Sequence, residues 1–183
     1  MLAAGAAARF GGAKQLAELD GRPLLEHALA AMAAAPLDRL VVVLGAGAEE
    51  IGARVSLHGA RVVVCADWSE GQAASLRAGV AALGDAAAAV VVLGDQPRIS
   101  AQAVARVLAA RGPGALAVRA TYDGRPGHPV VLERALFAPI ARLRGDAGAR
   151  DLLRGVAVRD VACDGLGRPD DVDTPEQLEV LRA

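Results

Sequence analysis

The chain has 183 residues, enough for one domain with a substantial hydrophobic core. Its 21 acidic and 20 basic side chains nearly cancel to a formal charge of −1, and the arginines are scattered, which argues against sequence-independent binding to nucleic acid. No window of about 18 uncharged apolar residues could span a bilayer. We therefore expect one domain over residues 1–183, with neither nucleic acid nor membrane as a partner.

Two features bear on the compartment. The first nine residues resemble a signal peptide only superficially, because they lack a basic start and are interrupted by Arg9. Cys65 and Cys163 lie far apart in apolar, strand-like stretches, which favours two separate buried thiols over a disulfide or a metal pair. Together these features predict a cytoplasmic protein.

Short apolar runs alternate with segments of helical periodicity along the chain. Four runs predict strands covered on both faces, as in a parallel sheet: residues 40–44, 62–64, 90–93 and 116–118. Helix starts are predicted at Pro23, at a Ser69–Gln72 capping box, at a Ser100 cap and at a Thr174–Gln177 capping box. The Gly- and Pro-rich residues 122–129 predict a less regular strand or hairpin. This alternation indicates the α/β class, with three layers around a parallel sheet.

The glycine-rich start carries the first candidate chemistry. Nineteen of the twenty basic residues are arginine, and the single lysine, Lys14, ends a run of small residues over positions 2–14. Small residues let backbone N–H groups close around an anion, and Arg9 and Lys14 could neutralise phosphate oxygens. A compact ammonium suits a triphosphate as a point charge. The run lacks the Gly-Lys-Ser/Thr of a Walker A loop, so an ordinary alanine-rich turn is the alternative.

Two aspartates are candidate metal ligands. Asp95 follows the predicted strand 90–93, and Asp173 precedes the last predicted helix. Mg²⁺ bound to phosphates usually takes one or two protein carboxylates. Each position also has an ordinary structural explanation, because Asp is common in turns and an acid is favourable at a helix N-terminus. Residues 45–50 look like a dinucleotide-binding loop, but Glu50 replaces its third glycine and favours a plain turn.

Several motifs in order along nearly the whole chain resemble those of the MobA-like nucleotidyltransferase family, and within it the molybdenum cofactor cytidylyltransferases. They lie at residues 2–14, 21–25, 68–79, 94–97, 127–129, 145–150 and 171–176. The resemblance implies a three-layer Rossmann-like nucleotidyltransferase fold with a mostly parallel central sheet. It also implies Mg²⁺-dependent transfer of CMP from CTP to the terminal phosphate of molybdopterin, with release of pyrophosphate. A molybdenum hydroxylase is the possible recipient of the product.

The resemblance also assigns roles to residues. Arg9 and Lys14 would hold the triphosphate, while Asp95, the third catalytic residue, and Asp173 would ligate Mg²⁺. The residues expected to contact the nucleotide or the acceptor are Ala3, Ala4, Gly5, Gly71, Ser75, Gln96 and His128. Ala4 and Gln96 favour CTP, because the family pairs L-A-A-G and D-Q-P with CTP, and L-A-G-G and D-M-P with GTP. His128 is either a hydrogen-bonded loop residue or a substrate contact.

The chain departs from the family's motifs in two places, and three functions other than cytidylyl transfer stay open. Ala7 stands where the family usually has Ser, which removes a hydroxyl that could touch phosphate. Only Met1 precedes Leu2, so we expect either a native start further upstream or a truncated first strand. The alternative functions are guanylyl transfer from GTP, NAD(P)H-dependent reduction, and non-catalytic carriage of molybdopterin.

Overall fold

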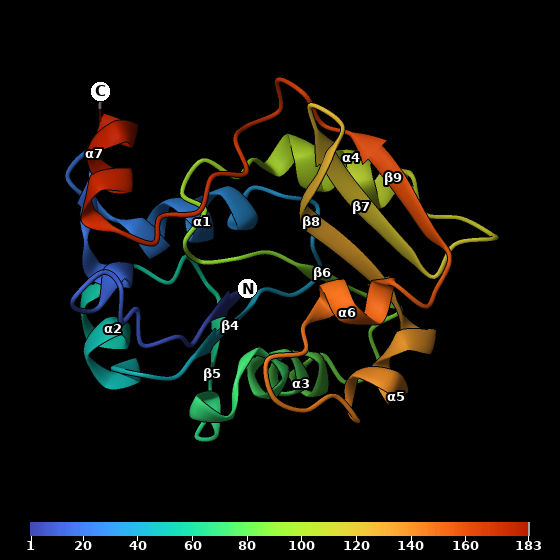
Figure 1. The fold of residues 1–183 in the computed structure, drawn as a ribbon, viewed down its shortest axis with the longest axis horizontal. Coiled ribbons are helices and arrows are strands. Elements are labelled where there is room, and N and C mark those ends of the chain that lie inside the picture. The colour runs from blue at the N-terminus through green and yellow to red at the C-terminus, as the bar shows by residue number, and fades with distance from the viewer. Residues whose placement is uncertain (183) are drawn as a thin grey trace.

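In the computed structural model, which describes residues 1–182, strands and helices alternate along most of the chain (Figure 1). The strands are β1 (Leu2–Ala3), β2 (Glu18–Leu19), β3 (Arg22–Pro23), β4 (Val41–Leu44), β5 (Arg61–Val64), β6 (Ala88–Val91), β7 (Ala117–Tyr122), β8 (Arg125–Glu133) and β9 (Val158–Ala162). The α-helices are α1 (Leu24–Ala33), α2 (Ala48–Arg54), α3 (Gln72–Ala82), α4 (Ala101–Ala109), α5 (Phe137–Ile140), α6 (Ala149–Leu153) and α7 (Pro175–Arg182). Short 3₁₀ turns occupy Lys14–Leu16, Trp68–Glu70 and Arg134–Leu136.

The central sheet is continuous because β1 joins two groups of strands. β1 pairs in parallel with β4, which in turn pairs with β5. On its other side the Leu2 N–H donates to Val92 O, and the Gly94 N–H donates to Leu2 O, both at 2.9 Å. The resulting order is β5-β4-β1-β6-β8-β7-β9, in which β8 alone runs antiparallel to its neighbours. The expected mostly parallel sheet is confirmed.

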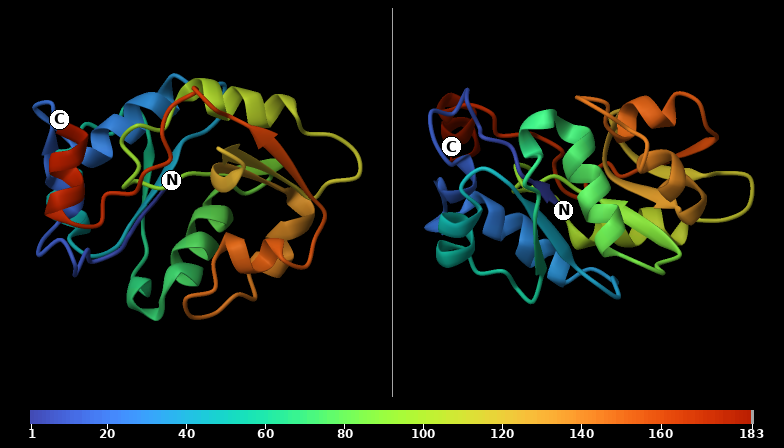
Figure 2. Two further views of the ribbon diagram at one scale, coloured as in Figure 1. Left: turned by 45° about the horizontal axis from the view of Figure 1, so that its top comes forward. Right: turned by 90° about the horizontal axis from the view of Figure 1, so that it is seen from below.

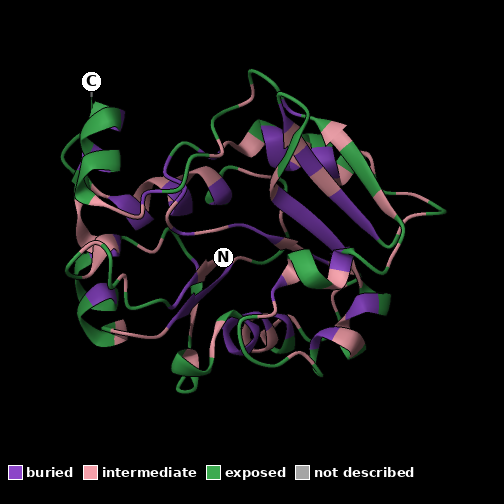
Figure 3. Cartoon of the chain, in the orientation of Figure 1, coloured by how far each residue is buried: buried purple, intermediate pink, exposed green. Residues whose placement is uncertain are grey.

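Helices cover both faces of this sheet, which makes three layers (Figure 2). On one face, α1 and α4 bury Leu25 and Val104 in the same cluster as Val42 of β4. On the other face, α3 buries Leu76, and α5 buries Ile140, in a cluster with strands β6 to β8. Figure 3 shows the central strands buried and the outer sides of the helices exposed. This arrangement is the predicted α/β architecture.

Strand β5 departs from the expectation that all four apolar runs are covered on both faces. All four residues of β4 are buried, whereas β5 has exposed ends, and Val64 is 64% exposed. β5 lies at the edge of the sheet, with a neighbour only on the β4 side. A run of valines therefore predicts a strand correctly without telling whether that strand is central or peripheral.

Two of the predicted helix caps form. Ser100 Oγ accepts a hydrogen bond from the Ala103 N–H at 3.1 Å at the start of α4. At the start of α7 the Thr174 N–H donates to Gln177 Oε1 at 3.0 Å, and the Gln177 N–H donates to Thr174 Oγ1 at 3.4 Å. Pro23 immediately precedes α1, one position before the helix begins. These local patterns satisfy backbone N–H groups that a helix start leaves free.

The predicted capping box at Ser69 and Gln72 is wrong. Ser69 lies in the 3₁₀ turn Trp68–Glu70, and Gly71 stands directly before α3 without any side-chain cap. Gly71 has a φ of 112°, a value that favours glycine, and it redirects the chain between the turn and the helix. The Gly71 backbone therefore decides where α3 begins.

This difference gives a stability prediction with an internal control. We expect Ser100→Ala to lower the free energy of unfolding by about 1 to 2 kcal/mol, because it removes a helix cap and a hydrogen bond to Leu166 O. Ser69→Ala should change it by less than about 0.5 kcal/mol, because this exposed side chain caps nothing. Urea unfolding measures both values. Equal losses in the two variants would contradict the assignment of caps.

The remaining local predictions concern a hairpin, a loop and the thiols. Residues 122–129 lie at a β7–β8 hairpin whose register shifts between Arg119 and Thr121, as their composition predicts. At Gly45 a Cβ atom would lie 2.5 Å from Ala4 O, so that glycine permits close packing between two loops. Cys65 and Cys163 are free and buried, which confirms the two separate thiols.

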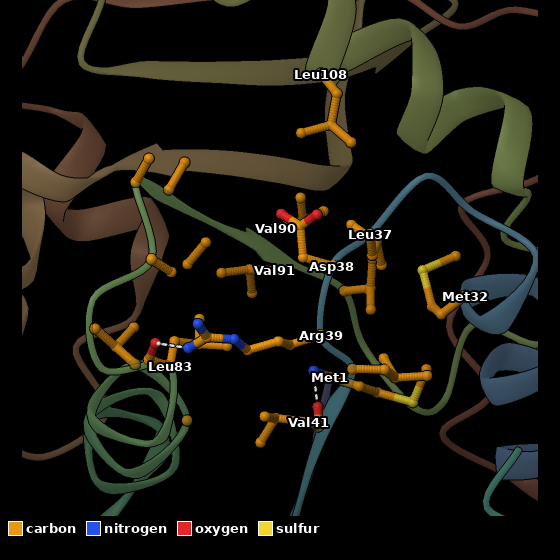
Figure 4. A pocket seen from close by; sticks show the side chains of 18 of the residues that line it. Met1, Met32, Leu37, Asp38, Arg39, Val41, Leu83, Val90, Val91 and Leu108 are labelled. Carbon is orange, nitrogen blue, oxygen red and sulfur yellow. Dashed lines mark hydrogen bonds between the residues drawn. The ribbon is translucent and has the colours of Figure 1, made fainter. Parts of the chain in front are cut away.

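A cavity of about 270 Å³, lined mainly by apolar residues together with Asp38, Arg39 and Arg111, lies beside Met1 at the amino ends of the central strands (Figure 4). Leu37, Val90 and Leu108 are among the side chains that line it. The Met1 amino group donates to Val41 O at 2.7 Å, and burial lowers the pKa of that amine to about 5. β1 contributes two residues to the sheet. Within residues 1–182, no helix combines the length and apolar character needed to cross a membrane.

Candidate functional site

A second cavity, of about 450 Å³, opens at the carboxyl ends of β1 and β6. The loop after β1 lines one side, and the turn before α3 lines another. The predicted site residues on its walls are Ala3, Ala4, Gly5, Arg9, Lys14, Gly71, Ser75, Asp95 and Asp173. Gly94 lets the end of β6 reach this place, because a Cβ atom there would lie 2.8 Å from the side chains of Ala3 and Leu25. This edge of a parallel sheet is where ligands of open α/β folds bind.

Gln15 fixes the loop that carries the small residues. Its side-chain amide is buried and donates to Ala3 O at 2.9 Å and to Gly5 O at 3.1 Å. The 3₁₀ turn Lys14–Leu16 is thereby tied to the end of β1. Gln15 was not predicted as a site residue, because its only signal in the sequence is an amide side chain beside Lys14. A neutral, buried donor that binds two carbonyls is a structural anchor for the loop.

Lys14 lies between two carboxylates that come from distant parts of the chain. Its Nζ atom is 2.7 Å from Asp95 Oδ2 and 2.8 Å from Asp173 Oδ1, and its side chain is 13% exposed. Burial opposes the charge of Lys14, but the hydrogen bonds to Asp173 and Asp95 outweigh burial and raise the pKa of the amine. The ammonium is therefore fully charged at neutral pH.

Arg9 adds a second cation on the open side of the same site. Its Nη2 atom lies 2.8 Å from Asp173 Oδ2, and its side chain is 74% exposed. The hydrogen bond from Lys14, helped by the charges of Lys14 and Arg9, lowers the pKa of Asp173. The two cations thus differ, because Lys14 is enclosed and Arg9 is free to reach a ligand that enters from solvent.

The carboxylates suit a divalent cation. Within residues 1–182, Asp95 Oδ1 is buried and has no hydrogen-bond partner, so it keeps a free acceptor beside Lys14. Oxygens of Asp95 and Asp173 already converge on one cation, the ammonium of Lys14. In the part of the chain that the structure describes, no group of three or more His, Cys, Asp and Glu side chains could hold a metal. Mg²⁺ typically binds through one or two carboxylates together with phosphate oxygens and water, which fits this pair.

Gln96 lies behind the site and, within residues 1–182, is not one of the residues that line the cavity. Its side chain is 3% exposed, and Nε2 donates to Pro169 O at 2.9 Å and to Asp171 Oδ1 at 2.7 Å. The Val172 N–H donates to Asp95 O at 2.9 Å. We call residues 169–172 the strap, because they bring the chain back across the end of β6 to Asp173. Gln96 therefore contacts the strap, whereas the resemblance placed it against the nucleotide.

The role of the Gln96 amide can be tested by placing a negative charge at this position. In Gln96→Glu both hydrogen bonds from Nε2 are lost, and a carboxylate is set against Asp171, whose own pKa is already raised by burial and by Asp95. We expect the free energy of unfolding to fall by about 2 to 4 kcal/mol near pH 7. The loss should shrink at lower pH, as the new carboxyl becomes protonated. Urea unfolding at two pH values measures both effects.

Gln177→Glu is the matched control for that experiment. Gln177 uses Oε1 to accept hydrogen bonds from the Asp173 and Thr174 N–H groups, and a carboxylate keeps both of these acceptors. The expected change in the free energy of unfolding is less than about 0.5 kcal/mol, because an acid is favourable at a helix start. A loss above about 2 kcal/mol in Gln177→Glu as well would show that the site tolerates no added charge.

Within residues 1–182, His128 is likewise not one of the residues that line the cavity. It lies half-buried on β8. Burial lowers the pKa of its imidazole to about 4, and the charge of Asp95 opposes that shift only in part. The Tyr122 hydroxyl donates to the His128 carbonyl at 3.0 Å. At neutral pH His128 is therefore an uncharged residue next to the site and carries no charge to a phosphate.

This pKa predicts a specific loss of stability in acid. The pKa of folded His128 is about 4, below its ordinary value of 6.5, so the unfolded chain binds the proton first. The contribution is complete above pH 6.5 and falls as the pH drops toward 4. Between about pH 7 and pH 4.5, we expect the wild type to lose about 2 kcal/mol more unfolding free energy than His128→Gln. Parallel losses in the two proteins would contradict the buried, neutral imidazole.

Comparison with known proteins agrees with this geometry. Residues 1–162 match the model of the MobA-like NTP transferase domain. The chain belongs to the MobA-like nucleotidyltransferase family. Its fold is correspondingly that of a Rossmann-like nucleotidyltransferase, and the resemblance to the MobA-like family that the motifs indicated is confirmed.

Three relatives are informative. The chain is 39% identical over 188 residues to nicotine blue oxidoreductase of Paenarthrobacter nicotinovorans, an alignment that covers 97% of this chain and 92% of the relative. The crystal structure of Rv0371c from Mycobacterium tuberculosis H37Rv superposes with a TM-score of 0.89 at 36% identity, covering 98% of this chain and 93% of the other. A structure of Rv0371c in complex with manganese gives a TM-score of 0.82 at 33% identity, covering 98% and 94% of the two chains.

Proposed function

We propose that this protein, acting as one domain over residues 1–183, transfers CMP from CTP to the terminal phosphate of molybdopterin and releases pyrophosphate. The observation that carries the proposal is the position of Lys14 between Asp95 and Asp173 on the wall of a large cavity. Membership of a nucleotidyltransferase family supports the reaction class. The buried free thiols support the reducing environment of the cytoplasm, and a molybdenum hydroxylase would receive the product.

The residues present can meet the demands of such a reaction. The attacking group is a phosphate, which is already ionised at neutral pH, so no general base is needed. What remains is alignment of the two reactants and neutralisation of the charge that develops on the leaving pyrophosphate. Arg9 can reach the outer phosphates from the exposed side, and Lys14 can neutralise those nearer the wall. The amino end of α3 at Gly71 adds a favourable dipole.

Asp95 and Asp173 are the residues that would hold Mg²⁺. The unpartnered Asp95 Oδ1, noted above among residues 1–182, is the acceptor best placed to gain from a cation. When bound, Mg²⁺ would supply further neutralisation of the phosphate charge. The manganese complex of Rv0371c supports a divalent cation in a relative of the same fold.

The choice of CTP rests on two residues with different positions. Ala4 lies on the cavity wall, where its side chain is buried, and it supports CTP through the family pattern. Gln96 supports CTP only through the family pattern, because its amide contacts the strap. Guanylyl transfer from GTP would use the same phosphate contacts, so the base must be tested directly.

A second candidate, NAD(P)H-dependent reduction, is favoured by the likeness to nicotine blue oxidoreductase over nearly the full chain. The cations Arg9 and Lys14 could also bind the pyrophosphate of a dinucleotide. The glycine loop at residues 45–50 gives this candidate no support, because Gly45 is packed against Ala4 O and Trp68. A non-catalytic carrier of molybdopterin is a third possibility that the same ligands can test.

Thermal melts with CTP, GTP and NADPH, each with and without Mg²⁺, separate these functions. A ligand at a hundredfold excess over its Kd adds about 2.7 kcal/mol, or roughly 5–10 °C for a chain of this size. We expect the largest shift with CTP and Mg²⁺ together, and pyrophosphate release when molybdopterin is added. A shift with NADPH alone would overturn the transferase. Nucleotide binding without pyrophosphate release would identify the carrier.

A further inference from the structure

We propose that Lys14 is an internal counter-cation that holds the metal position in the ligand-free protein, so that a divalent cation binds well only together with a polyphosphate. This inference rests on the proposed function. It differs from the simpler view in which Lys14 only awaits the triphosphate. The contacts of Lys14, Asp95 and Asp173 carry it.

The Lys14 ammonium occupies carboxylate oxygens that a metal would need. Lys14 Nζ contacts Asp95 Oδ2 at 2.7 Å and Asp173 Oδ1 at 2.8 Å. Among residues 1–182, Asp95 keeps Oδ1 free, whereas both oxygens of Asp173 are paired, Oδ1 with Lys14 and Oδ2 with Arg9. A Mg²⁺ ion binds oxygen at about 2.0–2.1 Å, so it cannot share Asp173 Oδ1 with the ammonium. A metal that bridges the two carboxylates therefore competes with the Lys14 ammonium for Asp173.

The Lys14 ammonium and its two carboxylate partners are partly shielded from solvent. The Lys14 side chain is 13% exposed, and those of Asp95 and Asp173 are 23% and 27% exposed, so solvent screens the group only in part. A metal ion that binds without phosphate must displace the Lys14 ammonium from the carboxylates of Asp95 and Asp173. The displaced ammonium then stays close to the metal and repels it. Wild-type protein without a phosphate ligand should therefore bind divalent cations weakly.

A polyphosphate can draw the Lys14 ammonium away from the two carboxylates. The backbone of Lys14 is held at the 3₁₀ turn Lys14–Leu16, which Gln15 anchors to the end of β1. The flexible four-carbon side chain can swing without any change in that backbone. A triphosphate in the cavity offers Lys14 new anionic acceptors, and its oxygens complete the coordination of the metal. The two ligands then favour each other through reciprocal coupling.

The test measures Mn²⁺ binding by electron paramagnetic resonance in the absence of nucleotide. We expect Lys14→Met to bind Mn²⁺ at least tenfold more tightly than the wild type. Arg54→Met is the control, because Arg54 is an exposed cation on α2 that pairs with Glu50 outside the site. It removes one positive charge without freeing an oxygen of Asp95 or Asp173, so its Mn²⁺ affinity should change less than threefold. Equal or weaker Mn²⁺ binding by Lys14→Met would overturn the proposal.

A second measurement uses the wild type and does not depend on whether a variant folds. Lys14 is the single lysine of the chain, so incorporation of ¹³C-labelled lysine gives one assigned side-chain signal. Excess Mg²⁺ alone should leave the Lys14 Cε signal in place, whereas Mg²⁺ with tripolyphosphate should move it. A signal that moves fully with Mg²⁺ alone would overturn the proposal. Tripolyphosphate carries no base, so failure of CTP specificity would leave this result intact.

Discussion

Asp95→Asn is expected to reduce turnover by about a thousandfold or more, measured as pyrophosphate release from CTP in the presence of molybdopterin. The substitution preserves size but removes the charge that pairs with Lys14 at 2.7 Å. It also replaces one oxygen by an amide nitrogen, which cannot accept a metal. This one substitution therefore removes a metal ligand and also an ion-pair partner of the enclosed Lys14 ammonium.

The control for this variant is Asp20→Asn. Asp20 is an exposed acid at the turn between β2 and β3, and its φ of 50° is one that Asn tolerates well. Its turnover should stay within about twofold of the wild type, because it lies outside the described cavity walls. If Asp95→Asn retained metal-dependent activity near the wild-type level, Asp95 would not be a metal ligand.

Lys14→Arg is expected to cost about a hundredfold in the same assay, although the charge is kept. The ammonium fits as a point charge between two carboxylate oxygens, in a position that is 13% exposed. A guanidinium is planar and longer, so it cannot occupy this point without moving Asp95 or Asp173. The guanidinium would also bind the carboxylates through paired N–H hydrogen bonds, and a phosphate would not readily break these.

Arg9→Lys is the comparison for Lys14→Arg, because it exchanges the same two residue types in the opposite direction at the exposed cation of the site. Arg9 is 74% exposed and has room for either cation, so a loss of less than about tenfold is expected. A Lys14→Arg protein with nearly normal turnover would show that charge alone matters at position 14. The same preparations should be checked by circular dichroism, so that lost activity is not confused with unfolding.

Local patterns predicted much of the fold because local physics decides it. The valine run at residues 41–43 forms a buried central strand, and Ser100 caps α4 through its own hydroxyl. The capping box at Ser69 failed for an equally local reason, since the positive φ of Gly71 moves the helix start beyond reach of that hydroxyl. The exposure of Val64 depended on the strand order, which no single run contains.

The candidate site was harder to predict because its contacts are long-range. Lys14 and Asp173 lie 159 positions apart, and no spacing rule joins them. The resemblance named both residues, but it could not tell that each would bind the other in the absence of ligand. Gln96 shows the opposite difficulty, because a family pattern linked it to the nucleotide whereas its amide holds Asp171 and Pro169. Such second roles depend on packing and not on residue type.

The strap has a consequence for the order in which the site is made during translation. A ribosome delivers Lys14 and Asp95 well before residues 169–173, and the strap docks through Val172 only after those residues have emerged. Until then Lys14 has one carboxylate partner, and the metal position has one ligand. A nascent chain is thus expected to hold neither metal nor nucleotide firmly. Binding competence is therefore acquired only after residues 169–173 have emerged.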